Sequence, residues 1–251
     1  MKLYRTRWKT LVCLLVLSAL LLLRQADAAA GSDRSHEPRI IQFSGYEWVV
    51  KTGYRAPGKN HWRSDNVWVD EEGLLHLKIS HTDNRWYCAE LLTTQTFSYG
   101  TYRFEVIAPL DQLDRNVILG LFVYPSDDNP DEDSEIDIEI AKWGDPVGKA
   151  GNYTVTSSKA THRFHFALQG NYSTHQFRWS KENVLFHSFH GHETKDQEPF
   201  GSWGYKADRH HGKNAVPPVR VHMNLWLLLG KAPWCRQEQE VIIKSFVYEP
   251  L

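Results

Sequence analysis

The sequence has almost no excess of charge, and this limits the partners that it implies. Its 29 Lys and Arg residues nearly balance its 30 Asp and Glu residues, for a net charge of -1 at pH 7. A chain with this balance has no general electrostatic attraction for nucleic acids or anionic membranes. Neither is therefore expected as a partner.

Segments with the period of an amphipathic helix are also lacking, as are internal repeats and linkers. What recurs instead is short strand-like runs separated by turn residues such as Asp70-Glu71-Glu72-Gly73. The runs span residues 46–51, 66–69, 74–80, 87–94, 99–107, 117–124, 153–156, 162–168, 175–179, 184–190, 219–229 and 240–248, and longer irregular stretches at 54–65, 111–116, 124–133 and 192–218 are candidate cleft-wall loops. This pattern predicts a single all-β domain over residues 40–251, folded as a β-sandwich.

No apolar run is long enough for an ordinary membrane span, which needs about 20 residues. The run from Leu11 to Leu23 is interrupted only by Ser18, follows several basic residues and precedes Ala26-Asp27-Ala28. This is the pattern of a secretory signal peptide over residues 1–28, with 29–39 as a flexible lead-in. We therefore expect a secreted or periplasmic protein that leaves the membrane after cleavage; an uncleaved anchor is the alternative, because Arg24 lies close to the run.

Cysteines are few, three in all. Cys13 lies within the apolar run, so cleavage leaves Cys88 and Cys235. An even pair in an oxidising compartment can form one disulfide. The sequence does not establish that the two thiols are close, and both states stay open.

The most distinctive stretch that is present runs from Asp133 to Gly144. Within it, Glu135, Asp137 and Glu139 alternate with isoleucines. Successive side chains of a strand point to opposite faces, so the three acids share one face. Asp and Glu are poor strand formers and like charges on one face repel, so local propensity does not explain them.

Glycosidic bond cleavage is the chemistry that fits these acids best. A retaining glycosidase needs one carboxylate as nucleophile and one carboxyl as general acid, roughly 5 Å apart. Positions four apart on a strand have Cα atoms about 13 Å distant, so the two glutamates must lean together across Asp137, which a concave sheet favours. Crowding is expected to raise at least one carboxyl pKa, so that a protonated acid and an ionised nucleophile coexist.

The segment 135–139 resembles the Glu-Ile-Asp-Ile-Glu signature of glycoside hydrolase family 16, the laminarinase and lichenase group. Segments similar to that family's follow the same order at 66–77, 89–106, 175–179 and 223–226. The resemblance implies a jelly roll of two antiparallel sheets with a concave carbohydrate-binding cleft. It also implies Glu135 as nucleophile, Glu139 as acid/base and Asp137 as the residue that tunes the nucleophile, with no cofactor. Segments 120–124 and 142–146 depart from the usual pattern, so the substrate does not transfer with the fold.

Aromatic side chains near the acids are candidates for sugar stacking, because sugar rings present apolar CH faces. Trp143 continues the alternation beyond Glu139 and is expected on the acidic face if the strand stays regular. Trp226 and Asn224 share a face of a later strand, and Trp86 precedes the strand of Glu90. Core packing is the competing interpretation for each tryptophan.

The expected function is hydrolysis of internal β-glycosidic bonds in a polysaccharide by a secreted, monomeric, retaining enzyme. β-1,3- or β-1,3/1,4-glucan is the favoured substrate. A transglycosylase and a non-catalytic glycan-binding protein are the alternatives. No metal is expected: the acidic run from Asp127 puts Glu132 where a calcium loop needs glycine, and the histidines at 187, 190, 192, 210 and 211 show no compact ligand pattern.

Overall fold

The computed structural model describes residues 38–129, 131–207 and 213–251, which belong to one compact unit, Pro38–Leu251. The expected signal peptide, most of the lead-in, His210 and His211 lie outside the described residues. Within the described ranges, no helix has the length and apolar character needed to cross a membrane.

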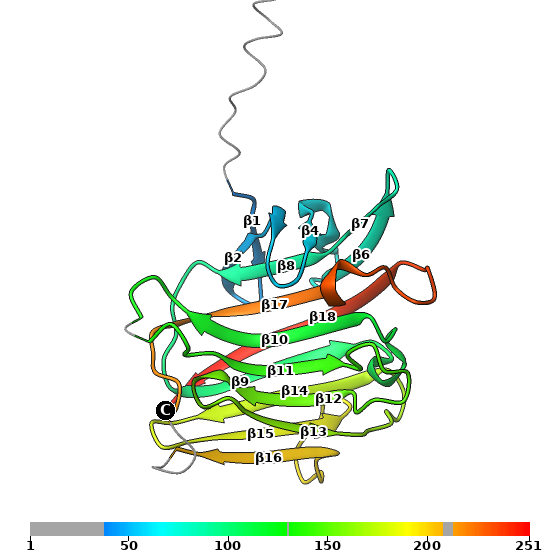
Figure 1. Ribbon diagram of the computed structural model, residues 1–251. Coiled ribbons are helices and arrows are strands. Elements are labelled where there is room, and N and C mark those ends of the chain that lie inside the picture. The colour runs from blue at the N-terminus through cyan, green and yellow to red at the C-terminus, as the bar shows by residue number, and fades with distance from the viewer. Residues whose placement is uncertain (1–37, 130, 208–212) are drawn as a thin grey trace, which may run out of the picture. The chain divides into compact units, whose positions relative to one another are not determined.

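Two large antiparallel sheets face each other and form the predicted all-β sandwich (Figure 1). The first sheet has the order β1 (Ile40–Phe43), β2 (Tyr46–Val50), β8 (Ala89–Thr93), β17 (Val219–Leu227), β10 (Val117–Pro125), β11 (Ile136–Ala141), β12 (Gly151–Val155) and β13 (Ala160–Phe164). The second has the order β16 (Gly201–Lys206), β15 (Asn183–His190), β14 (Tyr172–Trp179), β9 (Gly100–Ile107), β18 (Gln239–Pro250), β6 (Leu75–Thr82) and β5 (Val67–Val69), and β7 (Arg85–Tyr87) pairs with β6.

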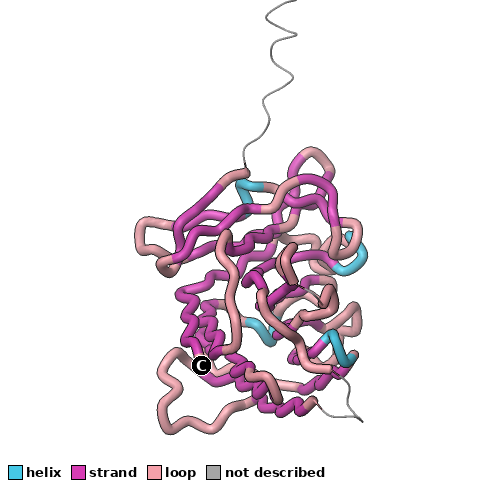
Figure 2. Tube along the Cα trace, turned by 90° about the vertical axis from the view of Figure 1, so that its left-hand side faces the viewer, coloured by secondary structure: helices cyan, strands magenta, loops and turns pink. Residues whose placement is uncertain are grey.

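The remaining elements are short. β3 (Gly53–Arg55) and β4 (Asn60–Trp62) form a separate hairpin, and single 3-10 turns span η1 (Ser64–Asn66), η2 (Leu110–Gln112), η3 (Thr156–Ser158) and η4 (Leu228–Gly230). Figure 2 shows how little of the described chain is helical.

Alternating apolar side chains build the core between the sheets. Ile136, Ile138 and Ile140 of β11 point inward and are at most 1% exposed. They join large buried aromatics from both sheets, among them Trp48, Trp179, Tyr102, Phe104 and Phe246. Each such side chain contributes about 1.5–3 kcal/mol by leaving water. The same alternation turns the acids of this stretch toward the outer face of the first sheet.

Every predicted strand run overlaps a strand of the structure, but several strands were missed. β4 and most of β3 lie in the stretch 54–65, and β16 lies in 192–218; both stretches were predicted as loops. The glycines of β16 suggested a loop in the sequence. In the structure, a Cβ added to Gly201 would overlap the ring of Phe164, so glycine is needed there for close packing rather than for a turn.

The two described cysteines are not bridged. Cys88 is buried just before β8, where its thiol lies 3.3 Å from Asn60 Oδ1. Cys235 is exposed in the turn after η4, where its backbone N–H donates to Asp114 Oδ2 at 2.8 Å. Burial raises the pKa of the Cys88 thiol to about 12, so it is an inert core group.

Candidate active site

The acidic strand β11 lies inside the first sheet, between β10 and β12. Its register puts Asp137 across from Phe122 of β10 and Glu139 across from Gly120. Glu135 directly precedes the strand, and its carbonyl accepts a hydrogen bond from Thr156 N–H at 3.0 Å. The three acids therefore follow one another along one face, as the alternation predicts.

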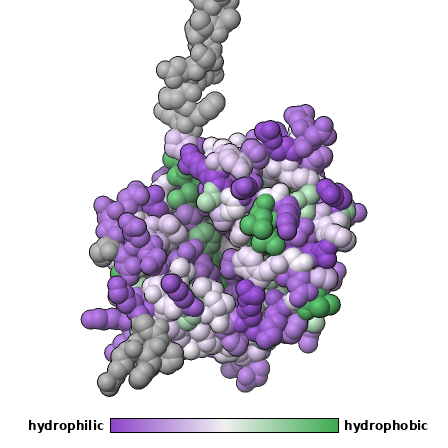
Figure 3. All heavy atoms as spheres, in the orientation of Figure 1, coloured by the Kyte–Doolittle hydropathy of each residue, from purple (hydrophilic) through white to green (hydrophobic). Residues whose placement is uncertain are grey.

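A cavity of about 440 Å³ opens over this face. It is lined by Lys51, Ala56, Pro57, Glu90, Gly120, Phe122, Tyr124, Glu135, Asp137, Glu139, His222, Asn224 and Trp226. The face of the molecule seen in Figure 3 is largely hydrophilic, with hydrophobic residues at a few separate places. The cavity thus combines carboxylates, one lysine and several aromatic rings.

Asp137 and Glu135 share a hydrogen bond, which requires a proton on one of them. Burial and the neighbouring charges of Glu135 and Glu139 raise the pKa of Asp137 well above its usual value. Burial also raises the pKa of Glu135, while the bond from Asp137 acts in the opposite direction. Asp137 therefore keeps the proton and donates a hydrogen bond to Glu135, which keeps the negative charge. The Thr156 hydroxyl lies 3.3 Å from Asp137 Oδ2.

Glu139 is the second perturbed glutamate. Burial, followed by repulsion from Glu135, raises the pKa of Glu139, and Arg163 partly offsets the rise, so that the net pKa is about 7. A carboxyl with this pKa holds a proton for much of the time near neutral pH. The site therefore contains two glutamates on one face of the sheet, of which Glu139 is the one poised to hold a proton near neutral pH, as general acid chemistry with a carboxylate partner requires.

One row of side chains crosses six strands through Glu139. It contains Arg163, Asn152, Glu139, Gly120, Asn224 and Glu90, on β13, β12, β11, β10, β17 and β8. Glycine at 120 is required because an added Cβ would overlap Asn224 Oδ1. The sequence GLFVY thus makes room for Asn224, which is 2% exposed.

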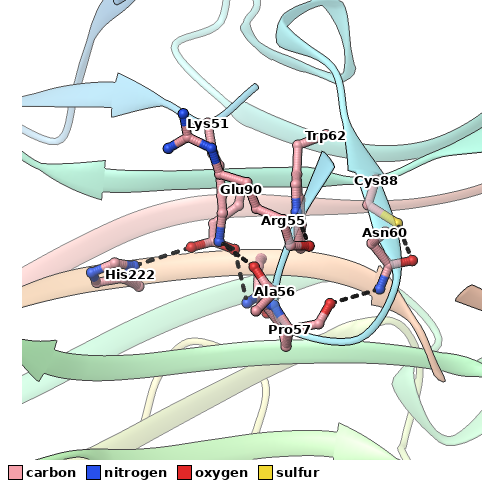
Figure 4. A network of polar contacts seen from close by, with 10 residues as sticks. Lys51, Arg55, Ala56, Pro57, Asn60, Trp62, Cys88, Glu90 and His222 are labelled. Carbon is pink, nitrogen blue, oxygen red and sulfur yellow. Dashed lines mark hydrogen bonds and ion pairs between the residues drawn. The ribbon is translucent and has the colours of Figure 1, made fainter. Parts of the chain in front are cut away.

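At the far end of this row, Glu90 is buried within a polar network (Figure 4). Its Oε2 lies 2.8 Å from Lys51 Nζ, and its Oε1 lies 3.2 Å from His222 Nδ1. Lys51 Nζ also donates to the Ala56 carbonyl at 2.8 Å, and Asn224 Nδ2 donates to Glu90 Oε2 at 3.4 Å. The network ties the segment before β4 to the cavity floor.

The tryptophans proposed from sequence have different positions. Trp226 lines the cavity. Trp143 is outside the lining and packs edge-on against the Trp226 ring, with ring centroids 6.2 Å apart. Trp143 does not continue the strand, because β11 ends at Ala141 and Trp143 has φ 53. Its indole N–H donates to Asn152 Oδ1 at 3.1 Å, which holds the ring beside Trp226.

Trp86 is outside the cavity lining in the described chain. It lies on β7, across from His81, and the two rings contact each other with centroids 4.7 Å apart and planes tilted by 37°. Trp86 was expected near the acids because it precedes the strand of Glu90. Between these two residues, however, the chain leaves its hairpin with β6 in the second sheet and enters the first sheet as β8.

Several residues of the site were missed by sequence reasoning: Lys51, Glu90, Phe122, Tyr124, Thr156 and His222. The available signal was alternation, since Phe122 and Tyr124 share a face of β10 and His222 shares a face with Asn224. Among the described residues there is no group of three His, Cys, Asp or Glu side chains placed to hold a metal ion.

Comparisons with known proteins identify the fold. No protein-family model matches the sequence, and no curated protein sequence matches it either. Among solved structures, Bacillus licheniformis β-glucanase superposes with a TM-score of 0.62 at 19% identity, covering 87% of this chain and 100% of its own. A β-1,3-1,4-glucanase (lichenase) from a mouse hindgut metagenome gives 0.61 at 19% identity, covering 86% and 98%.

A third similar structure is a pseudo β-1,3-glucanase of Mycobacterium tuberculosis, with a TM-score of 0.61 at 18% identity, covering 80% of this chain and 89% of its own. The predicted jelly roll of the laminarinase and lichenase group is therefore confirmed. At these identities the likeness establishes the fold alone, and the chemistry has to be argued from the site itself.

Proposed function

We propose that this protein is a retaining glycoside hydrolase that cleaves internal β-glycosidic bonds of a polysaccharide. One observation carries the proposal: a single cavity brings together Glu135 and Glu139 on one face of the sheet, both with raised pKa values, with an aromatic wall beside them. β-1,3- or β-1,3/1,4-glucan is the favoured substrate, because solved structures with this fold include proteins named as a β-1,3-1,4-glucanase and a pseudo β-1,3-glucanase.

In the proposed mechanism, Glu135 attacks the anomeric carbon while Glu139 donates its proton to the departing glycosidic oxygen. A glycosyl ester on Glu135 is the intermediate. The ionised Glu139 then takes a proton from water, which displaces Glu135 and restores both groups. Asp137 donates its hydrogen bond to the free Glu135 carboxylate and keeps it oriented. Trp226 and Asn224 are proposed to hold the sugars, and Trp143, which is outside the cavity lining, supports the Trp226 ring.

The first experiment is to replace the nucleophile. Glu135→Gln keeps the size of the side chain and removes its charge, so kcat is expected to fall at least ~1,000-fold, about 4 kcal/mol of barrier. Reducing ends released from a panel of β-glucans and β-galactans measure the loss, and circular dichroism controls for folding. Near-normal turnover by this variant would remove β11 from the mechanism.

The second experiment separates retention from inversion. Glu139→Ala is expected to attack a substrate with a dinitrophenolate leaving group, which needs no acid, and then to stall at the glycosyl ester. Added azide replaces base-activated water, and a retaining enzyme gives the β-glycosyl azide. An α-azide would indicate direct displacement and an inverting route.

The fold also includes a protein named as a pseudo-glucanase, so a glycan-binding protein without turnover is the relevant alternative. If the protein only binds glycans, the wild type should bind glucan but release no reducing ends. A transglycosylase predicts longer oligosaccharides among the products.

We also propose export of a monomer after cleavage near Ala28. Intact mass of the exported protein tests processing, and light scattering tests the oligomeric state. A membrane-bound species that retains residues 1–24 would favour the anchored form.

A further inference from the structure

His222 lies on the cavity floor but takes no part in the mechanism above. It stands across from Phe122, which in turn stands across from Asp137 on the next strand. Two strand spacings therefore separate the backbones of His222 and Asp137, roughly 10 Å. His222 is therefore set back from the acids across the sheet, beside the part of the cavity floor formed by β10 and β17.

The imidazole ring is held in place by its neighbours. The Phe122 ring stacks on it with centroids 4.9 Å apart and planes at 29°, and Tyr124 approaches edge-on at 5.8 Å. The side chain is 11% exposed, and its Nδ1 is anchored 3.2 Å from Glu90 Oε1. A group fixed in this way loses little conformational freedom when a ligand binds.

Glu90 determines which ring nitrogen of His222 carries hydrogen. Burial raises the pKa of Glu90, but the contacts with His222 and Lys51 outweigh burial and hold this pKa below its usual value. An ionised carboxylate only accepts hydrogen bonds, so Nδ1 carries the hydrogen and donates it. In the neutral ring, Nε2 then presents a lone pair. No described residue donates a hydrogen bond to Nε2.

We propose that His222 Nε2 accepts a hydrogen bond from a hydroxyl of the sugar next to the cleaved one, and so selects glycans that carry this hydroxyl. Lys51 and Glu90 are positioning residues that fix the ring and its tautomer. The proposal rests on the proposed glycosidase function, which supplies the substrate class.

A single substitution tests the positioning role. In Glu90→Gln, the amide oxygen must face Lys51 and Asn224, which both donate toward Oε2, so the amide NH₂ faces His222. Nδ1 then becomes an acceptor and the hydrogen moves to Nε2. The ¹⁵N shifts of the His222 ring report the tautomer directly, and His222→Gln identifies the resonances by their loss. Wild type with hydrogen on Nε2, or Glu90→Gln with it still on Nδ1, would overturn the assignment.

Substrate contact is tested with a pair of variants. His222→Phe keeps the ring stacked on Phe122 but has no acceptor, whereas His222→Gln restores one. The probes are a β-1,3-glucan tetrasaccharide and a β-1,3/1,4-glucan tetrasaccharide, each with analogues that lack one hydroxyl on the sugar next to the cleavage site. Removing the contacted hydroxyl is expected to lower kcat/KM of the wild type ~10- to 100-fold.

His222→Phe is expected to have the same reduced kcat/KM on the intact probe as the wild type has on the deoxy analogue. Its kcat/KM should fall no further on the deoxy analogue. His222→Gln should recover part of the loss. If His222→Phe still discriminated between an intact probe and its deoxy analogue as strongly as the wild type, the contact would be refuted.

Failure of this proposal is distinguishable from failure of the proposed function. Calorimetry of the two tetrasaccharides with Glu135→Gln, alone and combined with His222→Phe, measures the contact without turnover. Weaker binding in the double variant supports the contact even if no glycan is hydrolysed. Equal binding by the two proteins counts against His222, even if the wild type is an active glucanase.

Discussion

Removal of one exposed cation is expected to shift the pH range of activity. Arg163 is exposed on β13, and its register partner Asn152 stands directly across from Glu139. Burial and the charge of Glu135 raise the pKa of Glu139 and the Arg163 guanidinium lowers it, for a net value of about 7. Glu139 must be protonated to act as an acid, so activity is lost as pH rises through this pKa. Without the cation the pKa rises, and Arg163→Met should remain active to higher pH.

The size of the shift follows from the spacing of the strands. Two strand spacings separate the backbones of Arg163 and Glu139 by roughly 10 Å. At this separation, two unit charges interact by about 0.4 kcal/mol in water and about 1.7 kcal/mol at an effective dielectric constant of 20. Because 1.36 kcal/mol corresponds to one pKa unit, the basic limb should move up by roughly 0.3–1.2 pH units.

The assay is the pH dependence of kcat/KM, whose basic limb reports the acid of the free enzyme. Arg163→Lys keeps the charge and should keep the wild-type limb, which separates charge from the contact with Trp143. About 1 M salt shortens the screening length to roughly 3 Å and should shrink the difference. A basic limb that stays fixed or moves to lower pH in Arg163→Met would refute Glu139 as the titrating acid.

Three further results are expected. Asp137→Asn keeps a hydrogen-bond donor for Glu135 and should retain a higher kcat than Asp137→Ala. The pKa of Asp137 is raised in the folded state, so its ionisation costs stability as pH rises above the unfolded pKa. In calorimetric scans, Asp137→Asn should therefore melt higher than the wild type at pH 8 but not at pH 3, by ~2–4 °C per kcal/mol recovered. Cys235 should react rapidly with a thiol reagent and Cys88 only after unfolding, and a mass change on reduction would contradict the unbridged state. Gly120→Ala should displace Asn224, lower stability by about 1–3 kcal/mol in urea unfolding and lower kcat/KM, whereas an unchanged variant would show that the crowding is relieved elsewhere.

The sequence predicted what depends on local alternation. Alternation on β11 was enough to turn Glu135, Asp137 and Glu139 to one face, because a strand has a fixed two-residue period. The same rule failed at Trp143, where a positive φ ends the strand before the ring is reached. Alternation describes a strand only as far as the strand extends, and its end depends on neighbouring loops.

The rest of the site depends on pairing between distant strands. Glu90 and His222 are 132 residues apart in sequence and meet only because β8 and β17 are neighbours in one register. Nothing local to either residue encodes that register, which comes from the packing of the whole sheet. Lys51 joins the site in the same way: it follows β2, which pairs with β8, and this pairing brings it into a salt bridge with Glu90.

The strand order places a timing constraint on the assembly of the molecule. β17 lies between β8 and β10, and β18 lies between β9 and β6, so the last two strands in sequence occupy interior positions of both sheets. Until they are inserted, strands made much earlier have unpaired edges that invite association with other chains. The cavity floor is likewise incomplete without residues 219–227, which supply His222, Asn224 and Trp226. A growing or cut-short chain that lacks residues 219–227 therefore carries the three acids but not the three side chains beside them, and the cavity is complete only once β17 has paired with β8 and β10.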